Sequence, residues 1–252
     1  MDCVVFNKNK QKEYKRNELQ KSEYKKLVEE NLEELFGCSL IASDYLISEE
    51  SNLKIDALGI DDNYQLVVFE YKLGKFSKLI NKGLMIIDYI NEHLSEFKIL
   101  INDLLKEEAK NVMYLPRLVV VGDSFHKYDG YSISKLPYNI ELINVNLYNK
   151  DLVLIEKKHV SRNVDVSGLK YRIDGDIKYL FDELVNFLLS LGDEVTLFAN
   201  GNVVFVRKIK TFMYIVFEEG LNIFMNNKMK QIKSIKDLEK AFLDIEKEYD
   251  KR

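Results

Sequence analysis

The chain has 252 residues, of which 46% are hydrophobic and 31% are charged, and its formal net charge at pH 7 is −4. This length allows one large domain or two modest ones, and the apolar content provides ample core material. The acidic balance excludes a protein coated in positive charge, so any nucleic-acid contact must come from a local patch.

Cysteine, histidine and hydropathy patterns exclude several other classes. The two cysteines, Cys3 and Cys38, lack CxxC spacing and are expected to be reduced. The three histidines are scattered without metal-ligand spacing, which argues against a zinc site. The apolar run at residues 3–6 is too short for a signal peptide, and no stretch has the length of a membrane span. We therefore expect a cytoplasmic protein with no membrane partner.

Basic residues are dense between Lys8 and Lys26. They could form a patch that contacts nucleic acid, or they could simply be the solvated face of a helix. From about Glu18 to Phe36, apolar residues recur at intervals of three and four, which predicts an amphipathic helix that ends at Gly37. Glutamates 29 and 34 flank its apolar stripe, so either could face a neighbouring sheet edge, unless the glutamates of this helix all face solvent. A first strand is predicted over residues 38–46.

The next stretch is predicted to be a β-hairpin with strands at 54–60 and 65–72. The second strand contains an unbroken apolar run at 66–69, which is typical of a strand buried on both faces. It ends in Glu70 and Lys72, which stand two residues apart and so project from the same side. If the loop has three residues, residue 56 lies opposite residue 70, and Asp56 joins the same face.

After Gly74 the apolar period changes, which predicts helices over 79–94 and 97–109. A continuous apolar run then predicts a central strand at 118–121, and two further strands are predicted at 140–143 and 152–155. This order of elements predicts an α/β fold with a central mixed sheet flanked by helices.

Residues 159–175 are poor in apolar side chains and are predicted to link a first domain, 1–158, to a second, 176–252. The second domain should contain helices at 177–191 and 235–249 around short antiparallel strands. We expect a small α+β domain, and we find no catalytic constellation in it.

The charged end of the hairpin has the composition of a cation site. Mg²⁺ is commonly held by one or two carboxylates together with waters and substrate phosphate, and Asp56 and Glu70 suit that role, with the Tyr71 carbonyl completing the protein ligands. Lys72 would orient or help deprotonate an attacking water. A structural Asp–Lys pair is the alternative. The place of these charges at the end of a buried strand favours the cation site, because buried charges are costly unless they are paired or bind a metal.

Asp56 with Glu70-x-Lys72 resembles the motif of the PD-(D/E)XK, or restriction-endonuclease-like, nuclease superfamily, with Ile55 in place of the leading proline. The likeness extends to an uncharacterised bacterial and archaeal group within that superfamily. The resembling segments span most of residues 20–156, at 29–33, 55–61, 70–72, 80–84, 122–129 and 139–142. The segment from residue 190 onward resembles a small domain of unknown function that is often attached to such nucleases.

The resemblance implies a restriction-endonuclease-like fold and a Mg²⁺- or Mn²⁺-dependent nuclease that hydrolyses DNA phosphodiester bonds in repair, restriction or defence. It implies Asp56 and Glu70 as metal ligands and Lys72 as the catalytic lysine. Glu29 would be the helix carboxylate, with the adjacent Glu30 as an alternative.

The resemblance implies an Ile-Asn-Gln-Gly sequence at residues 80–83, and this chain has Lys82 in place of the glutamine. Lys82 and Lys75 are the candidate nucleic-acid-binding residues. The lysine also motivates a second hypothesis, a nuclease-fold module without chemistry that binds nucleic acid or a protein partner. A purely structural assembly subunit is a third, and the sequence leaves homodimerisation open.

Overall fold

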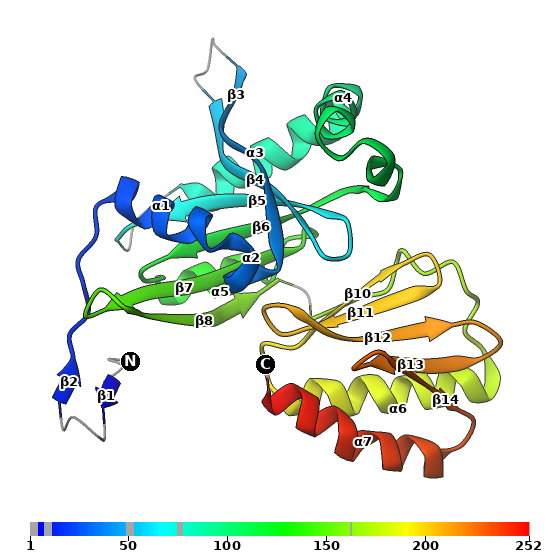
Figure 1. Cartoon of the computed structure of the whole chain (residues 1–252). Coiled ribbons are helices and arrows are strands. Elements are labelled where there is room, and N and C mark those ends of the chain that lie inside the picture. Colours follow the sequence, from blue (N-terminus) through cyan, green and yellow to red (C-terminus); the bar gives the residue numbers. More distant parts are fainter. Residues whose placement is uncertain (1–4, 8–11, 49–52, 75–77, 162, 252) are drawn as a thin grey trace. The chain divides into compact units, whose positions relative to one another are not determined.

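The computed structural model describes residues 5–7, 12–48, 53–74, 78–161 and 163–251 (Figure 1). The chain divides into two compact units, Met1–His159 and Val160–Arg252, and each is described by itself below.

Unit 1 is built on a six-stranded mixed sheet with strand order β3-β4-β5-β6-β7-β8. The strands β3, β4 and β5 pair antiparallel, whereas β5, β6 and β7 pair parallel. Their bounds are β3 Cys38–Ser48, β4 Leu53–Asp61, β5 Gln65–Lys72, β6 Met113–Gly122, β7 Ile140–Tyr148 and β8 Leu152–Val160. A separate pair, β1 Val5–Asn7 and β2 Lys12–Tyr14, precedes them. The mixed α/β architecture agrees with the sequence prediction.

Helices cover both faces of this sheet. The helices are α1 Lys21–Glu30, α2 Leu32–Phe36, α3 Leu79–Glu92, α4 Leu94–Leu105, the 3₁₀ turn η1 Lys106–Asn111 and α5 Lys127–Ile133. Phe36 of α2 packs edge-on against Phe69 of β5. The neighbouring strand residue, Val68, lies in a core cluster with Ile86 of α3. Since neighbouring strand residues point to opposite faces, the two helix groups lie on opposite sides of β5.

Two predicted helices differ from the observed ones. The helix expected over 18–36 begins at Lys21 and is interrupted at Asn31, whose φ of −122° is not helical, so two shorter helices result. The helix expected over 97–109 ends at Leu105, because Lys106 has a φ of +51°. The predicted stop at Gly37 is confirmed, with a φ of +62° that glycine adopts readily.

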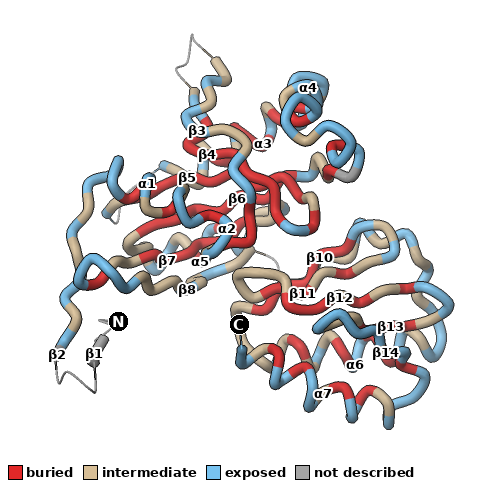
Figure 2. The backbone as a smooth tube through the Cα atoms, viewed as in Figure 1, coloured by how far each residue is buried: buried red, intermediate tan, exposed pale blue. Residues whose placement is uncertain are grey.

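Every residue of β5 is buried, as the apolar run predicted, and the central strands form the most deeply buried part of unit 1 (Figure 2). Helix α3 lies very close to this layer. A Cβ atom added at Gly83 would lie 2.4 Å from a methyl carbon of Leu118 on β6, so glycine is what permits the approach.

A buried ion-pair network crosses strands β4, β6, β7 and β8. Arg117 Nη1 donates to Glu141 Oε1 at 2.9 Å, and Arg117 Nη2 lies 3.5 Å from Asp61 Oδ2. Lys157 Nζ lies 2.8 Å from Glu141 Oε2, and all four side chains are buried. Each charge therefore has an opposite partner, which offsets much of the cost of burial.

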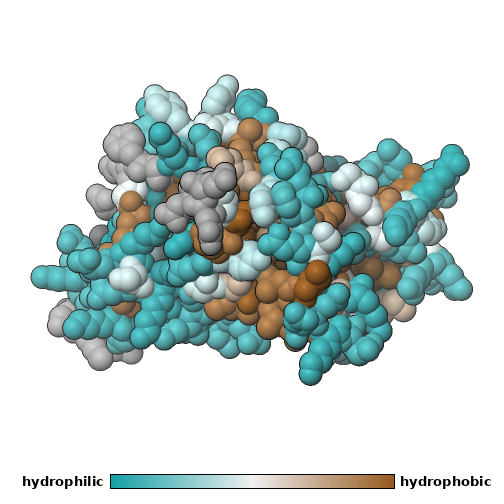
Figure 3. Space-filling model, turned by 90° about the horizontal axis from the view of Figure 1, so that it is seen from above, coloured by the Kyte–Doolittle hydropathy of each residue, from teal (hydrophilic) through white to brown (hydrophobic). Residues whose placement is uncertain are grey.

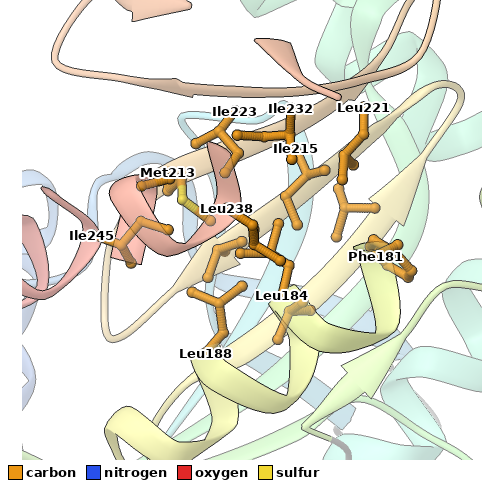
Figure 4. Close-up of a cluster of buried hydrophobic side chains, with 14 of the residues drawn as sticks. Phe181, Leu184, Leu188, Met213, Ile215, Leu221, Ile223, Ile232, Leu238 and Ile245 are labelled. Carbon is orange, nitrogen blue, oxygen red and sulfur yellow. The ribbon is translucent and has the colours of Figure 1, made fainter. Parts of the chain in front are cut away.

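Unit 2 has a second six-stranded sheet with order β14-β13-β12-β11-β10-β9, covered by two helices. Residues from α6, β12, β13, β14 and α7 meet in its core (Figure 4). The bounds are β9 Val164–Asp165, α6 Gly175–Leu191, β10 Thr196–Asn200, β11 Val203–Arg207, β12 Thr211–Phe217, β13 Leu221–Met225, β14 Lys228–Ile232 and α7 Ile235–Asp250.

The linker predicted over 159–175 is largely wrong, because most of this segment is built into unit 2. Strand β9 pairs parallel with β10, and Leu169 forms a β-bridge with Gly201. Val166, Leu169 and Tyr171 pack against the core of this unit. The polar composition of the segment concealed these contacts.

On the face shown in Figure 3, hydrophilic side chains cover most of the surface and hydrophobic ones gather in smaller areas. Among the described helices, none is long and apolar enough to cross a membrane.

Candidate functional site

The hairpin of β4 and β5 brings Asp56 and Glu70 together. Ala57 pairs with Phe69, and the same register places Asp56 opposite Glu70, as the sequence predicted from the loop 62–64. The Asp56 backbone N–H donates to Glu70 Oε1 at 3.3 Å, and the Tyr71 N–H donates to Asp56 Oδ2 at 3.0 Å. Two carboxylates are therefore fixed to neighbouring strands by backbone hydrogen bonds.

Lys82 of α3 reaches both carboxylates. Its Nζ donates to Asp56 Oδ1 at 3.0 Å and to Glu70 Oε2 at 2.7 Å. Lys21, at the start of α1, approaches the other oxygen of Asp56, with 3.4 Å between its Nζ and Oδ2. One carboxylate oxygen from each strand thus converges on a single point, and an ammonium group stands there.

Burial and charge act differently on the two carboxyl groups. Burial, followed by the charge of Asp56, raises the pKa of Glu70 to about 7, although Lys82 opposes this shift. Burial would also raise the pKa of Asp56, but the Tyr71 N–H bond and the Lys82 charge outweigh it, so this pKa lies below its usual value. Burial lowers the pKa of Lys82, yet its bonds to the carboxylates raise it overall. Lys82 therefore stays protonated between them.

Lys72 lies at the end of β5, on the same side as Glu70 by the alternation of the strand. Its buried Nζ donates to Asp129 Oδ2 at 3.0 Å and stands 4.9 Å from the centre of the Phe125 ring. Asp129 Oδ2 also accepts the His126 N–H at 2.9 Å, at the start of α5. Among the described residues, no hydrogen bond joins Lys72 to the two carboxylates. The first turn of α5, together with Phe125 in the loop after β6, positions this ammonium group.

Glu29 faces inward from α1, whereas Glu30 is exposed and pairs with Lys26. The Glu29 carboxylate accepts hydrogen bonds from Ser43 Oγ at 3.0 and 3.3 Å, and burial raises its pKa. Its charge, after burial, contributes to the raised pKa of Tyr71. Glu29 thus lies beside the Tyr71 side chain, on the face of β5 opposite Glu70, and it has no direct contact with Asp56 or Glu70 among the described interactions.

Two hollows are each lined in part by Asp123, which follows β6. One has a volume of about 410 Å³ and is lined in part by Tyr24 and Leu73, and the other has about 720 Å³ and includes Phe125. Asp123 accepts the Gly74 N–H at 2.9 Å and pairs with Arg16 at 3.3 Å. The smaller hollow thus reaches Leu73, just after β5, but the described residues that line the two hollows do not include Asp56, Glu70, Lys72 or Lys82. The other predicted nucleic-acid contact, Lys75, lies outside the described residues.

The donor set at this point suits a hard cation. Among the described residues, no group of three or more His, Cys, Asp and Glu side chains could hold a metal ion. Asp56 and Glu70 nevertheless offer oxygen atoms that already converge on one positive charge, and Mg²⁺ usually takes only one or two protein carboxylates. The residues therefore fit a divalent cation, provided that the Lys82 ammonium moves away.

Asp129 and Lys21 are the contacts that the sequence analysis did not assign. Asp129 belongs to the segment 122–129, which follows β6, and β6 is the parallel neighbour of β5. Carboxyl ends of parallel strands meet at one sheet edge, which is a signal that could have placed Asp129 beside Lys72. Lys21 carried no comparable signal, because its position depends on how α1 packs.

No family model and no solved structure matches the chain. An uncharacterised protein of Haemophilus influenzae is 26% identical over 146 residues, which cover 55% of this chain and 47% of the relative. The matched region thus spans about half the length of that curated relative.

Proposed function

We propose that unit 1 is a Mg²⁺-dependent nuclease of the restriction-endonuclease-like fold that hydrolyses DNA phosphodiester bonds, and that unit 2 positions substrate or a partner. The observation that carries the proposal is the convergence of Asp56 Oδ1 and Glu70 Oε2 on one point, with Lys72 two residues further along β5. The likeness of the motif residues to the PD-(D/E)XK superfamily supports the same assignment.

Each residue has a distinct role in this proposal. Asp56, Glu70 and the Tyr71 carbonyl would hold Mg²⁺ or Mn²⁺, which when bound supplies charge neutralisation at the phosphoryl group. Lys72 is held by Asp129 and offers a proton-bearing ammonium to the attacking water or to the phosphoryl oxygens.

The test is cleavage of labelled single-stranded, duplex and branched DNA with and without Mg²⁺ or Mn²⁺. Wild type should cut at least one substrate only with metal, and Asp56→Asn should not. A matched control is Asp88→Asn on α3, which removes a carboxylate that bonds only to Tyr138 in the described structure and should cut normally. Equal activity of wild type and Asp56→Asn would rule out the proposed site.

The Lys82 bridge favours a second candidate, a nuclease-fold module that binds nucleic acid without cutting it. Such a module needs no metal, because the two carboxylates already share a cation. It predicts DNA binding that is independent of Mg²⁺ and that weakens steeply with salt, since phosphate contacts release counterions. Metal-dependent cleavage would exclude this candidate, and the mass of the free and DNA-bound protein would show whether it acts as a homodimer.

A further inference from the structure

The position of Lys82 is fixed by the helix that carries it. The adjacent Gly83 lets α3 approach β6 so closely that a Cβ there would lie 2.4 Å from Leu118. The backbone at Lys82 is therefore held close to the sheet, within reach of Glu70 on β5. The Lys82 side chain is 26% exposed, and its ammonium group donates two hydrogen bonds to the carboxylates.

Glu70 explains why a cation is needed at this point. Its side chain is fully buried, and it lies opposite a second carboxylate in the hairpin register. A buried carboxylate without a partner is strongly destabilising, whereas a paired one is tolerated. The Lys82 ammonium donates to both carboxylates and so performs, within the folded chain, the charge compensation that a bound cation would perform.

A metal ion and this ammonium group cannot occupy the same point. A divalent cation would need Asp56 Oδ1 and Glu70 Oε2, which are the atoms that Lys82 contacts at 3.0 and 2.7 Å. Mg²⁺ binds oxygen ligands at about 2.1 Å, which leaves no room for an ammonium between the same two oxygens. The lysine must withdraw towards solvent before metal can enter.

We propose that Lys82 is a tethered competitor of the divalent cation, so that its removal tightens metal binding at Asp56 and Glu70. This inference rests on the proposed metal-dependent function and adds a residue that sets metal affinity. Because the Lys82 side chain is flexible and partly exposed, it can turn towards solvent when a cation binds, so the competition is reversible.

Lys21 provides a matched control within the same site. It also carries one positive charge close to Asp56, but it approaches the other oxygen, Oδ2, at 3.4 Å and its side chain is 55% exposed. Removing Lys21 lowers the local positive charge without vacating the point between the carboxylates. A general electrostatic effect would appear in both variants, whereas competition for one position would appear only at Lys82.

The experiment is isothermal titration of the full chain with MnCl₂ and MgCl₂. Lys82→Gln and Lys82→Met should bind Mn²⁺ at least about tenfold more tightly than wild type, a change of ~1.4 kcal/mol. The methionine variant offers no oxygen, so its gain reports loss of the competitor and not gain of a ligand. Lys82→Arg should bind Mn²⁺ with the wild-type affinity, and Lys21→Gln should stay within about threefold of wild type.

Thermal unfolding gives a second readout that does not depend on activity. Without metal, Lys82→Met should melt below wild type, and Mn²⁺ should raise its melting temperature by more than that of wild type, because the tighter ligand stabilises the folded state more. Lys82→Arg, which retains a cation, should show neither change.

The outcomes separate this inference from the proposed function. If wild type binds Mn²⁺ and the Gln and Met variants bind no more tightly, the inference is overturned while the metal site stands. Equal tightening in Lys21→Gln also overturns it, because the effect would then be one of net charge. If neither wild type nor any Lys82 variant binds metal, both the inference and the metal-dependent function fail.

Discussion

Lys82 Nζ lies 2.7 Å from Glu70 Oε2 and forms the shorter of its two bonds to the carboxylates of the hairpin. The closer partner is the fully buried one, so the cation sits where desolvation makes it most valuable. This arrangement links α3 to the end of β5. The net charge at the two carboxylates therefore depends on how α3 packs against the sheet.

The protonation of Glu70 should make stability depend on pH. Its pKa is raised on folding from 4.5 to about 7, chiefly by burial. A raised acid pKa stabilises the folded state fully below pH 4.5, and this contribution is lost as the pH rises through about 7. Glu70→Gln remains neutral, so it should gain up to about 3 kcal/mol relative to wild type across that range. Urea unfolding followed by circular dichroism at pH 4.5, 6 and 7.5 measures the difference, and a pH-independent difference would contradict it.

Asp129→Asn should lower DNA cleavage, if the proposed nuclease is correct, by about 10- to 100-fold, as expected when a partner that orients a functional group is lost. The reason is that Asp129 Oδ2 accepts the bond that positions Lys72, and the neutral oxygen of an amide holds an ammonium group less strongly than a carboxylate oxygen does. An asparagine oxygen can still accept the His126 N–H, so the start of α5 should remain capped. Cleavage kinetics and melting temperature are measured together. A loss of rate that merely follows a loss of folding would argue against a positioning role.

Arg117→Met should destabilise unit 1 by about 3 to 5 kcal/mol, because it removes the buried guanidinium group that pairs with both Asp61 and Glu141 in the interior. Arg172→Met is a matched control, since the Arg172 side chain is 89% exposed and its change should stay within about 0.5 kcal/mol. Denaturant midpoints by circular dichroism compare the two. Similar midpoints for both variants would show that the buried network contributes little.

Gly83→Ala should destabilise the protein by about 1 to 3 kcal/mol through overpacking, because the new Cβ meets Leu118 at 2.4 Å. When it is combined with Leu118→Ala, the total loss of stability should be smaller than the sum of the two single losses, since the second change removes the side chain that the new Cβ would meet. A double-mutant cycle in urea unfolding measures the coupling. Strictly additive effects would indicate that α3 shifts freely away from β6.

The hairpin could be predicted because its determinants are local. Strand alternation and loop length together fix the register, and they placed Asp56 opposite Glu70 before any tertiary contact was considered. The central strands β5 and β6 could be predicted as well, since each contains four consecutive apolar residues, at 66–69 and 118–121.

Other features depend on packing that no local pattern encodes. The Lys82 bridge requires the distance between α3 and β5, and a lysine on a helix gives no sign of which carboxylate it will reach. The break at Asn31 occurs within a continuous apolar stripe. The segment 159–175 was predicted to be a linker because it is poor in apolar side chains, and its pairing with β10 is a tertiary contact that this composition does not encode.

The pairing of β9 with β10 determines where a recombinant fragment of unit 2 should begin. Asn163 Nδ2 donates to the carbonyls of Asp193 and Val195, and its own carbonyl accepts the Leu197 N–H at 2.7 Å. A recombinant fragment of unit 2 that starts at residue 176 would discard an edge strand and expose the backbone of β10 to intermolecular pairing. One that starts before Asn163 would keep this edge covered.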